Sequence, residues 1–146
     1  MKVQKASNVE MVERTPMAPQ PGDPALRLLK WWDHDYMVYC CELQEARYEV
    51  TEEGALGLGN WTTVLDVVGT GTLEQLCLER AAYKAIEVLM DHADAAAMDA
   101  GFDTGEFSGP RHQAMADNEI TVLAQQYGFS YDQVMDMVAY VTTHRD

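Results

Sequence analysis

The sequence predicts an α+β fold: an α-β-β-β-α core, in which a helix packs on a small antiparallel sheet, followed by a C-terminal helical hairpin. Runs rich in β-branched and aromatic residues at 35–43, 46–54 and 61–68 indicate three strands. Apolar residues recur at helical spacing from 73 to about 99. Two Ser/Thr-x-x-Gln capping boxes, which begin at Thr72 and Ser130, mark helix starts.

The elements before the strands are assigned from proline positions. Residues 1–23 hold three prolines and few large apolar residues, which is typical of a flexible or partner-ordered arm. Asp23 before Pro24 reads as an N-cap followed by proline at the first helical position. The apolar stripe that follows predicts a helix over 24 to about 33; it comprises Ala25, Leu28, Leu29 and Trp32.

The predicted domain boundaries follow from these elements. We expect an α-β-β-β-α domain over 24–100, a glycine-rich loop over 101–109 and a helical hairpin over 110–146. Gly69 and Gly71 allow a tight strand-to-helix turn. Gly128 ends the first helix of the hairpin.

Charge and cysteine usage narrow the class of protein. The 146 residues carry 10 Lys and Arg against 24 Asp and Glu, a formal net charge of -14, which disfavours nucleic-acid binding. Three cysteines without a C-x-x-C pair predict reduced thiols and a cytoplasmic location, or the host cytoplasm for a viral protein. The sequence has no signal-peptide core and no apolar run of membrane-spanning length, so we expect no membrane association.

No pattern of catalytic or cofactor-binding residues is found, so the prediction is a non-enzyme without cofactor or metal. Cys40 and Cys41 are adjacent and point to opposite faces of a strand, and Cys77 falls within a helix, where burial raises the pKa of a thiol. His34 and His92, each beside aspartates, are interpreted as solvated helix faces rather than metal ligands.

The segment from 69 to 89 resembles the junction between the last strand and the second helix of a double-stranded-RNA-binding domain. The matching residues are Gly69, Gly71, Thr72, Ala81, Ala82, Lys84, Ile86 and Leu89, and the resemblance covers roughly residues 24–92. That family grips phosphates with lysines in the first turn of this helix, where this chain has Glu74, Gln75 and Leu78. The resemblance therefore implies a copy that has lost RNA binding and acts as a dimerisation or protein-docking module.

Three hypotheses for the function remain. The leading one is an adaptor that binds a protein partner, for which a basic protein is one option, or a second copy of itself. The others are an acidic viral accessory inhibitor, which mimics nucleic acid toward a host defence or nucleic-acid-handling protein, and a virion assembly component whose arm is held by a neighbour. The candidate interface residues are Leu78, Glu74, Trp61, Met137 and Val141.

Overall fold

The computed structural model describes residues 9–102 and 108–144. The chain divides into two compact units, with the boundary between Cys77 and Leu78. Residues 1–8 of the predicted arm and residues 103–107 of the predicted loop lie outside the described residues.

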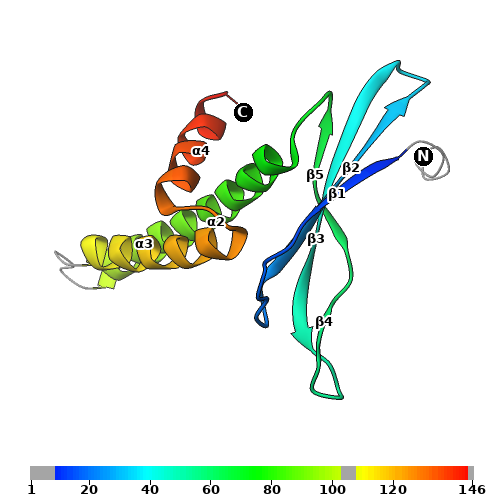
Figure 1. The fold of residues 1–146 in the computed structure, drawn as a ribbon. Coiled ribbons are helices and arrows are strands. Elements are labelled where there is room, and N and C mark those ends of the chain that lie inside the picture. The colour runs from blue at the N-terminus through cyan, green and yellow to red at the C-terminus, as the bar shows by residue number, and fades with distance from the viewer. Residues whose placement is uncertain (1–8, 103–107, 145–146) are drawn as a thin grey trace. The chain divides into compact units, whose positions relative to one another are not determined.

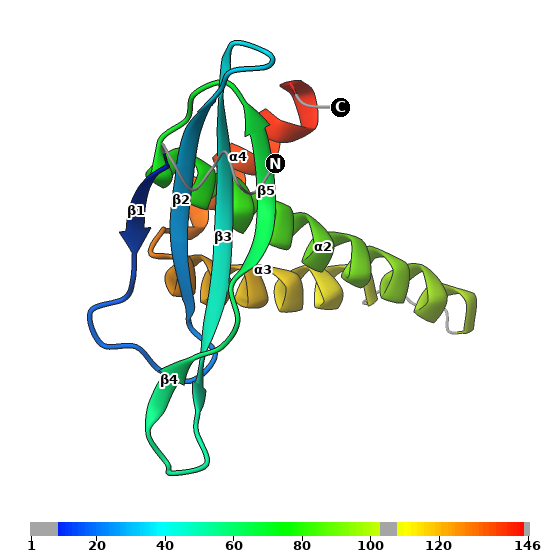
Figure 2. The same ribbon diagram turned by 90° about the vertical axis from the view of Figure 1, so that its right-hand side faces the viewer.

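The first unit is a curled antiparallel sheet of five strands (Figure 1). The strands are β1 (Glu10–Arg14), β2 (Pro24–Asp33), β3 (Val38–Val50), β4 (Leu56–Leu58) and β5 (Thr62–Val68). Strand β2 lies between β1 and β3, and the other edge of β3 pairs with β5 near its start and with β4 near its end. Figure 2 shows β1, β2, β3 and β5 side by side.

One face of this sheet forms the core of the first unit. Leu43 of β3 pairs with Leu28 of β2 on one side and with Leu65 of β5 on the other. Leu28 and Leu43 are buried, and Leu26, two residues before Leu28, is buried on the same face. The burial of these leucines fixes the register in which the strands pair, because a shift of one residue would turn the leucines to the opposite face of the sheet.

The predicted α-β-β-β-α order is wrong, because all five strands precede the first helix. The error begins at residues 24–33, which were predicted to be a helix and form β2. This segment pairs with β3 along its whole length and with β1 on its other edge. The partner in β1, Glu10–Arg14, falls within the stretch predicted to be an arm.

Asp23 does not cap a helix. Its carboxylate Oδ2 accepts a hydrogen bond from the Gln20 amide at 2.9 Å, and its carbonyl accepts one from Tyr48 N at 3.0 Å. Asp23 therefore closes a turn that leads into the sheet, and Pro24 takes the first position of a strand, where proline is tolerated.

The runs at 35–43 and 46–54, predicted as two strands, contribute to the single long strand β3.

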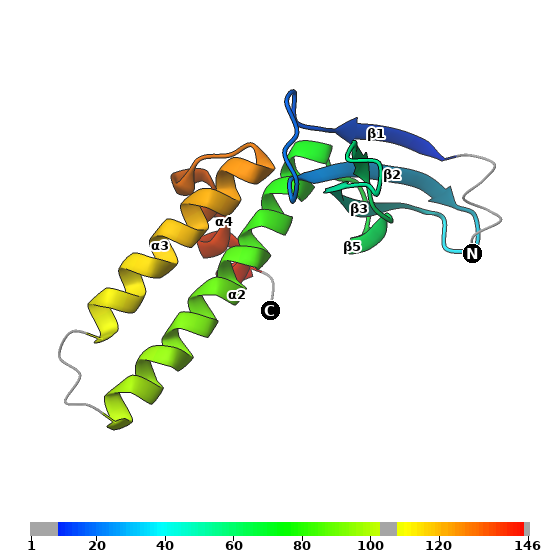
Figure 3. The ribbon, with the colours of Figure 1, turned by 90° about the horizontal axis from the view of Figure 1, so that it is seen from below.

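Three helices follow the sheet: α2 (Leu73–Phe102), α3 (Ser108–Tyr127) and α4 (Tyr131–His144). The first residues of α2, up to Cys77, belong to the first unit, and the rest of the helices make the second. Figure 3 shows α2 and α3 side by side. Residues at i, i+4 spacing form the buried stripe of α3, namely Ala116, Ile120 and Ala124, and α4 buries Val134, Val138 and Val141.

Three predicted helix boundaries are confirmed by their hydrogen bonds or backbone: the start of α2 after Thr72, the end of α3 at Gly128 and the start of α4 after Ser130. The predicted loop over 101–109 is too long, because α2 runs on to Phe102 and α3 already begins at Ser108. Gln75 N donates to Thr72 Oγ1 at 3.1 Å at the start of α2. At the start of α4, Gln133 N donates to Ser130 Oγ at 3.1 Å while Ser130 N donates to Gln133 Oε1 at 2.9 Å, which is a complete capping box. Gly128 has a φ of 86° directly after α3, as expected for a glycine that ends a helix.

A helix that crosses a bilayer must be both long and apolar, and the helices of this chain can be compared with that requirement. None of them, within residues 9–102 and 108–144, combines the length and the apolar character that crossing a membrane demands.

Candidate functional site

The turn between β2 and β3 is held by its own hydrogen bonds. Asp33 Oδ1 accepts from the amides of Asp35 at 2.9 Å and Tyr36 at 3.2 Å, and the Asp33 carbonyl accepts from Met37 N at 2.7 Å. An aspartate side chain that bonds the backbone two residues ahead is the usual stabiliser of such turns. The turn is therefore ordered by local contacts, and its outward side chains are presented from a fixed backbone.

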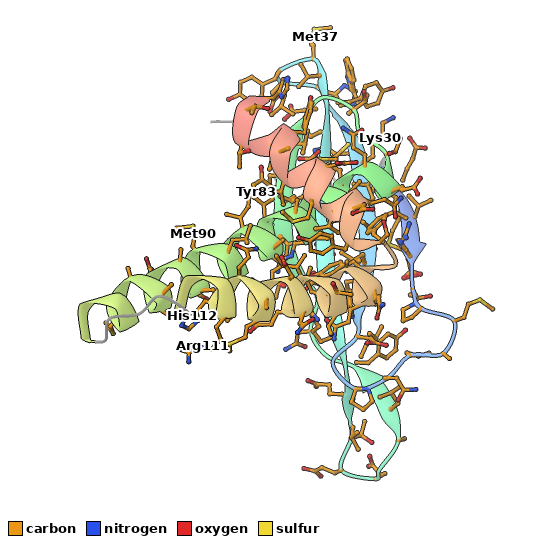
Figure 4. The ribbon with its side chains drawn as sticks, turned by 90° about the vertical axis from the view of Figure 1, so that its left-hand side faces the viewer. Lys30, Met37, Tyr83, Met90, Arg111 and His112 are labelled. Carbon is orange, nitrogen blue, oxygen red and sulfur yellow. The ribbon has the colours of Figure 1, made fainter. Side chains whose placement is uncertain are left out.

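Met37, the last residue of this turn, has a left-handed backbone with a φ of 55°. The left-handed conformation costs a residue with a Cβ about 1–2 kcal/mol, which is why glycine or asparagine normally occupies it. Burial does not offset this cost, since the Met37 side chain is 71% exposed. Figure 4 shows Met37 at the end of the hairpin. A large apolar side chain kept at a strained, exposed position motivates a functional role.

Met37 belongs to a group of aromatic and apolar side chains at this end of the sheet, which we name the hairpin-end patch. Its members are Trp31, Trp32, Tyr36, Met37, Tyr39 and Val68. Tyr36 is 79% exposed and Val68 is 77% exposed. Strand pairing places Trp32 opposite Tyr39 on one face of the sheet, and Trp31 and Val68 opposite Cys40 on the other face, so the patch surrounds this end of the sheet. Tryptophan, tyrosine and methionine are the residues enriched at the centres of protein interfaces.

Two cations of the sheet lie against aromatic rings. Lys30 Nζ lies 4.8 Å from the centroid of Tyr39, whose ring also meets Trp32 edge-on at 4.9 Å. Arg27 lies 4.2 Å from the centroid of the Trp61 ring, and its Nε donates to Gln44 Oε1 at 2.7 Å. These contacts hold the two positive charges on the sheet. The turn itself contributes the carboxylates of Asp33 and Asp35, and their negative charge repels a phosphate group that approaches this end of the sheet.

Two cysteines of the first unit, Cys40 and Cys77, have raised pKa values. Burial raises the pKa of Cys77 to about 12, which confirms the prediction made from its place in a helix. Burial, followed by the charge of Asp33, also raises the pKa of the half-buried Cys40. A thiol with a raised pKa is a weak nucleophile, so neither group is set up for covalent catalysis.

The predicted interface residues are distributed over both units. Trp61 is half-buried just before β5, and Glu74 is exposed in the first turn of α2. Leu78 is half-buried in α2, Met137 is half-buried in α4, and Val141 is buried one turn beyond Met137. Of these five side chains, only that of Glu74 is exposed.

The hairpin-end patch was missed by the sequence reasoning because Trp31 and Trp32 were assigned to a helix. The signal was present in the order of residue types: an aromatic run, the triplet Asp33-His34-Asp35, then a second aromatic run. Aspartate at such a break is typical of a turn within a hairpin. His34 is exposed in this turn and not on a helix face as predicted.

His92 also differs from its predicted place on a solvated face. It lies between α2 and α3, with only 14% of its side chain exposed. Among the described residues, no three His, Cys, Asp or Glu side chains are grouped so that they could hold a metal ion.

No known protein family, curated protein or solved structure proved similar to this chain, and none of these comparisons identifies a double-stranded-RNA-binding domain in it.

Proposed function

We propose that this protein is a non-enzymatic protein-binding module, and that the hairpin-end patch is the surface that docks its partner. The observation that carries the proposal is the exposure of Tyr36 and Met37 on a turn fixed by Asp33. Side chains of this kind dominate binding energy when a partner buries them. The three free cysteines suit the cytoplasm as its compartment.

Preorganisation makes this turn a favourable anchor. Burying one large apolar side chain is worth about 1.5–3 kcal/mol. A flexible loop would lose part of that gain in ordering its backbone on binding, whereas the bonds to Asp33 already order this turn. Loss of one such anchor, at about 2 kcal/mol, corresponds to roughly a thirtyfold rise in Kd.

Charge indicates the chemistry of the partner. Asp33 and Asp35 directly precede Tyr36 and Met37 in the turn, and the whole chain carries a net charge of -14. A complementary surface has an apolar pocket framed by lysines or arginines. Proteins that handle nucleic acids carry such basic surfaces, and this is the partner class of the inhibitor hypothesis.

The experiment compares capture by the full-length chain with capture by the Tyr36→Ser, Met37→Ser double variant. The matched control is Met17→Ser, because Met17 is a fully exposed methionine of the same unit, outside the patch. Proteins recovered from cells of the source and lost with the double variant, but kept with the control, are then purified. Their Kd is measured by calorimetry, and we expect at least a thirtyfold weakening in the double variant.

Two results would overturn the proposal. Recovered proteins that bind the double variant and the wild type with equal Kd would show that the patch is not the docking surface. Quenching of tryptophan fluorescence by a single-stranded oligonucleotide at physiological salt would instead make the aromatic rings a base-stacking surface. Sedimentation of the wild type as a dimer and of the double variant as a monomer would support the patch, with a second copy as the partner.

A further inference from the structure

Strand β1 forms one edge of the five-stranded sheet, as Figure 2 shows. Among the described residues it pairs only with β2, so its other side presents backbone N–H and C=O groups with no strand opposite them. Four of its five residues are exposed, and two of these are the large apolar side chains of Met11, 52% exposed, and Val12, 56% exposed. An edge of this kind is a template on which a further strand can pair.

An apolar row runs across the sheet and stops at this edge. Leu43 of β3 lies opposite Leu28 of β2, and Leu28 lies opposite Val12 of β1. The exposed fraction rises along the row from 0% at Leu43 through 4% at Leu28 to 56% at Val12. A hollow of about 240 Å³, lined only by residues of the first unit, lies against Val12, Leu28 and Leu73. The row therefore ends in apolar surface that a further strand would bury.

The sequence of β1 is complementary to itself when two copies run antiparallel. With Val12 opposite the second copy's Val12, all five residues are paired, and Glu10 lies opposite the second copy's Arg14 at both ends. Any other register leaves at least one residue of β1 without a residue opposite it. Opposite charges that face each other across two strands stabilise the pairing.

The surroundings of β1 suit this register as well. Glu10 lies opposite Lys30 of its own chain, so charges of opposite sign alternate across the joint. Arg14 already interacts within its own chain, but a guanidinium has five N–H donors and can bind a second carboxylate. On the other face Met11 lies opposite the second copy's Glu13, which has Arg27 of its own chain on its other side.

We propose that β1 is a dimerisation edge, at which two copies of this chain pair antiparallel about Val12 and join their sheets into one. The self-complementary order of charges favours a second copy over an unrelated strand. A contact of five residues a side is smaller than a standard interface, so the dimer dissociates on dilution. No residue of β1 belongs to the hairpin-end patch, and the inference does not depend on the proposed role of that patch.

Sedimentation of charge-reversed full-length chains tests the pairing. Glu10→Arg sets two arginines opposite each other at both ends of the joint, and Arg14→Glu sets two glutamates there. We expect the Kd of the dimer to rise at least about tenfold in each variant. An equimolar mixture of the two variants has opposite charges at both ends again and should dimerise with about the wild-type Kd. Glu53→Arg makes the same charge change at an exposed position after β3 and should keep the wild-type Kd.

Disulfide trapping tests the register without a change of charge. Position 12 is the one residue of β1 that meets itself in this pairing, at a Cα–Cα distance of about 4.5–5.5 Å, which a disulfide spans. With oxidised glutathione as the oxidant, Val12→Cys should form a covalent dimer. Met11→Cys, at a similarly exposed position of the same strand, should stay largely monomeric.

Several results would overturn the dimerisation edge. These are a wild type that sediments as a monomer at about 1 mM, a mixture of the charge variants that is no more dimeric than either alone, and equal cross-linking of Val12→Cys and Met11→Cys. If Arg14→Glu does not fold, the disulfide comparison decides by itself. A dimer that is lost in the Tyr36→Ser, Met37→Ser variant and kept in Glu10→Arg would place the second copy on the hairpin-end patch instead.

Discussion

Replacing Met37 by glycine should leave the first unit about as stable as the wild type. Relief of the left-handed backbone favours the variant by about 1–2 kcal/mol. The greater freedom of glycine in the unfolded chain opposes this by about 0.4–1 kcal/mol. The side chain is 71% exposed, so its remaining burial contributes only about 0.5 kcal/mol. We therefore expect a free energy of unfolding within about 0.5 kcal/mol of the wild-type value.

Met17→Gly is the matched control. Met17 is fully exposed and does not have a positive φ, so its replacement carries the entropic cost of glycine without the relief of strain. Met37→Gly should exceed Met17→Gly in stability by about 1 kcal/mol. Urea unfolding followed by tryptophan fluorescence measures both, because all three tryptophans lie in the first unit. If Met37→Gly is the less stable of the two, Met37 is a structural residue and the reasoning that links its strain to binding fails.

Three further predictions concern the helices. Ser130→Ala should lower the free energy of unfolding by about 1 kcal/mol, since the amide of Gln133 loses its acceptor; no change in thermal midpoint would mean that water replaces the cap. The pKa of Cys77 is raised to about 12 in the folded protein, so the unfolded chain releases the thiol proton at a lower pH than the folded chain does. The free energy of unfolding should therefore fall above about pH 8.5. Denaturant titrations at several pH values should show a smaller fall in Cys77→Ala. Ala82→Glu places a carboxylate at a fully buried position and should lower the free energy of unfolding by several kcal/mol. Ala97→Glu, at an exposed position of α2, is the control and should leave the free energy of unfolding unchanged. Equal melting temperatures of the two variants would contradict this prediction.

Helix boundaries were predictable because their determinants are local. The Ser130 capping box, the left-handed Gly128 and the Thr72 cap each bond within a few residues along the chain. Such contacts form whatever the rest of the chain does, so residue types at fixed offsets suffice to place them. The strand at 61–68 was also predictable, because its β-branched residues suit a pleated surface.

The conformation of residues 24–33 was not predictable in this way. Its apolar residues satisfy a helical stripe, and Asp23-Pro24 is a common helix start. The same run also places Leu26 and Leu28 on one face of a strand. Pairing along its whole length with β3 and along its other edge with β1 decided the outcome, and hydrogen bonds to distant partners outweigh a small difference in local propensity.

The candidate site depends on the same tertiary choice. The sequence by itself determined where α2 and α4 begin, where α3 ends, the strand character of 61–68 and the acidic charge. Only the tertiary structure decided that Trp32 and Tyr39 lie opposite each other and that Met37 is exposed in a left-handed turn. The physical reason is that an apolar run buries its side chains in either a helix or a strand, and only the segments available for pairing determine which surface stays open to a partner.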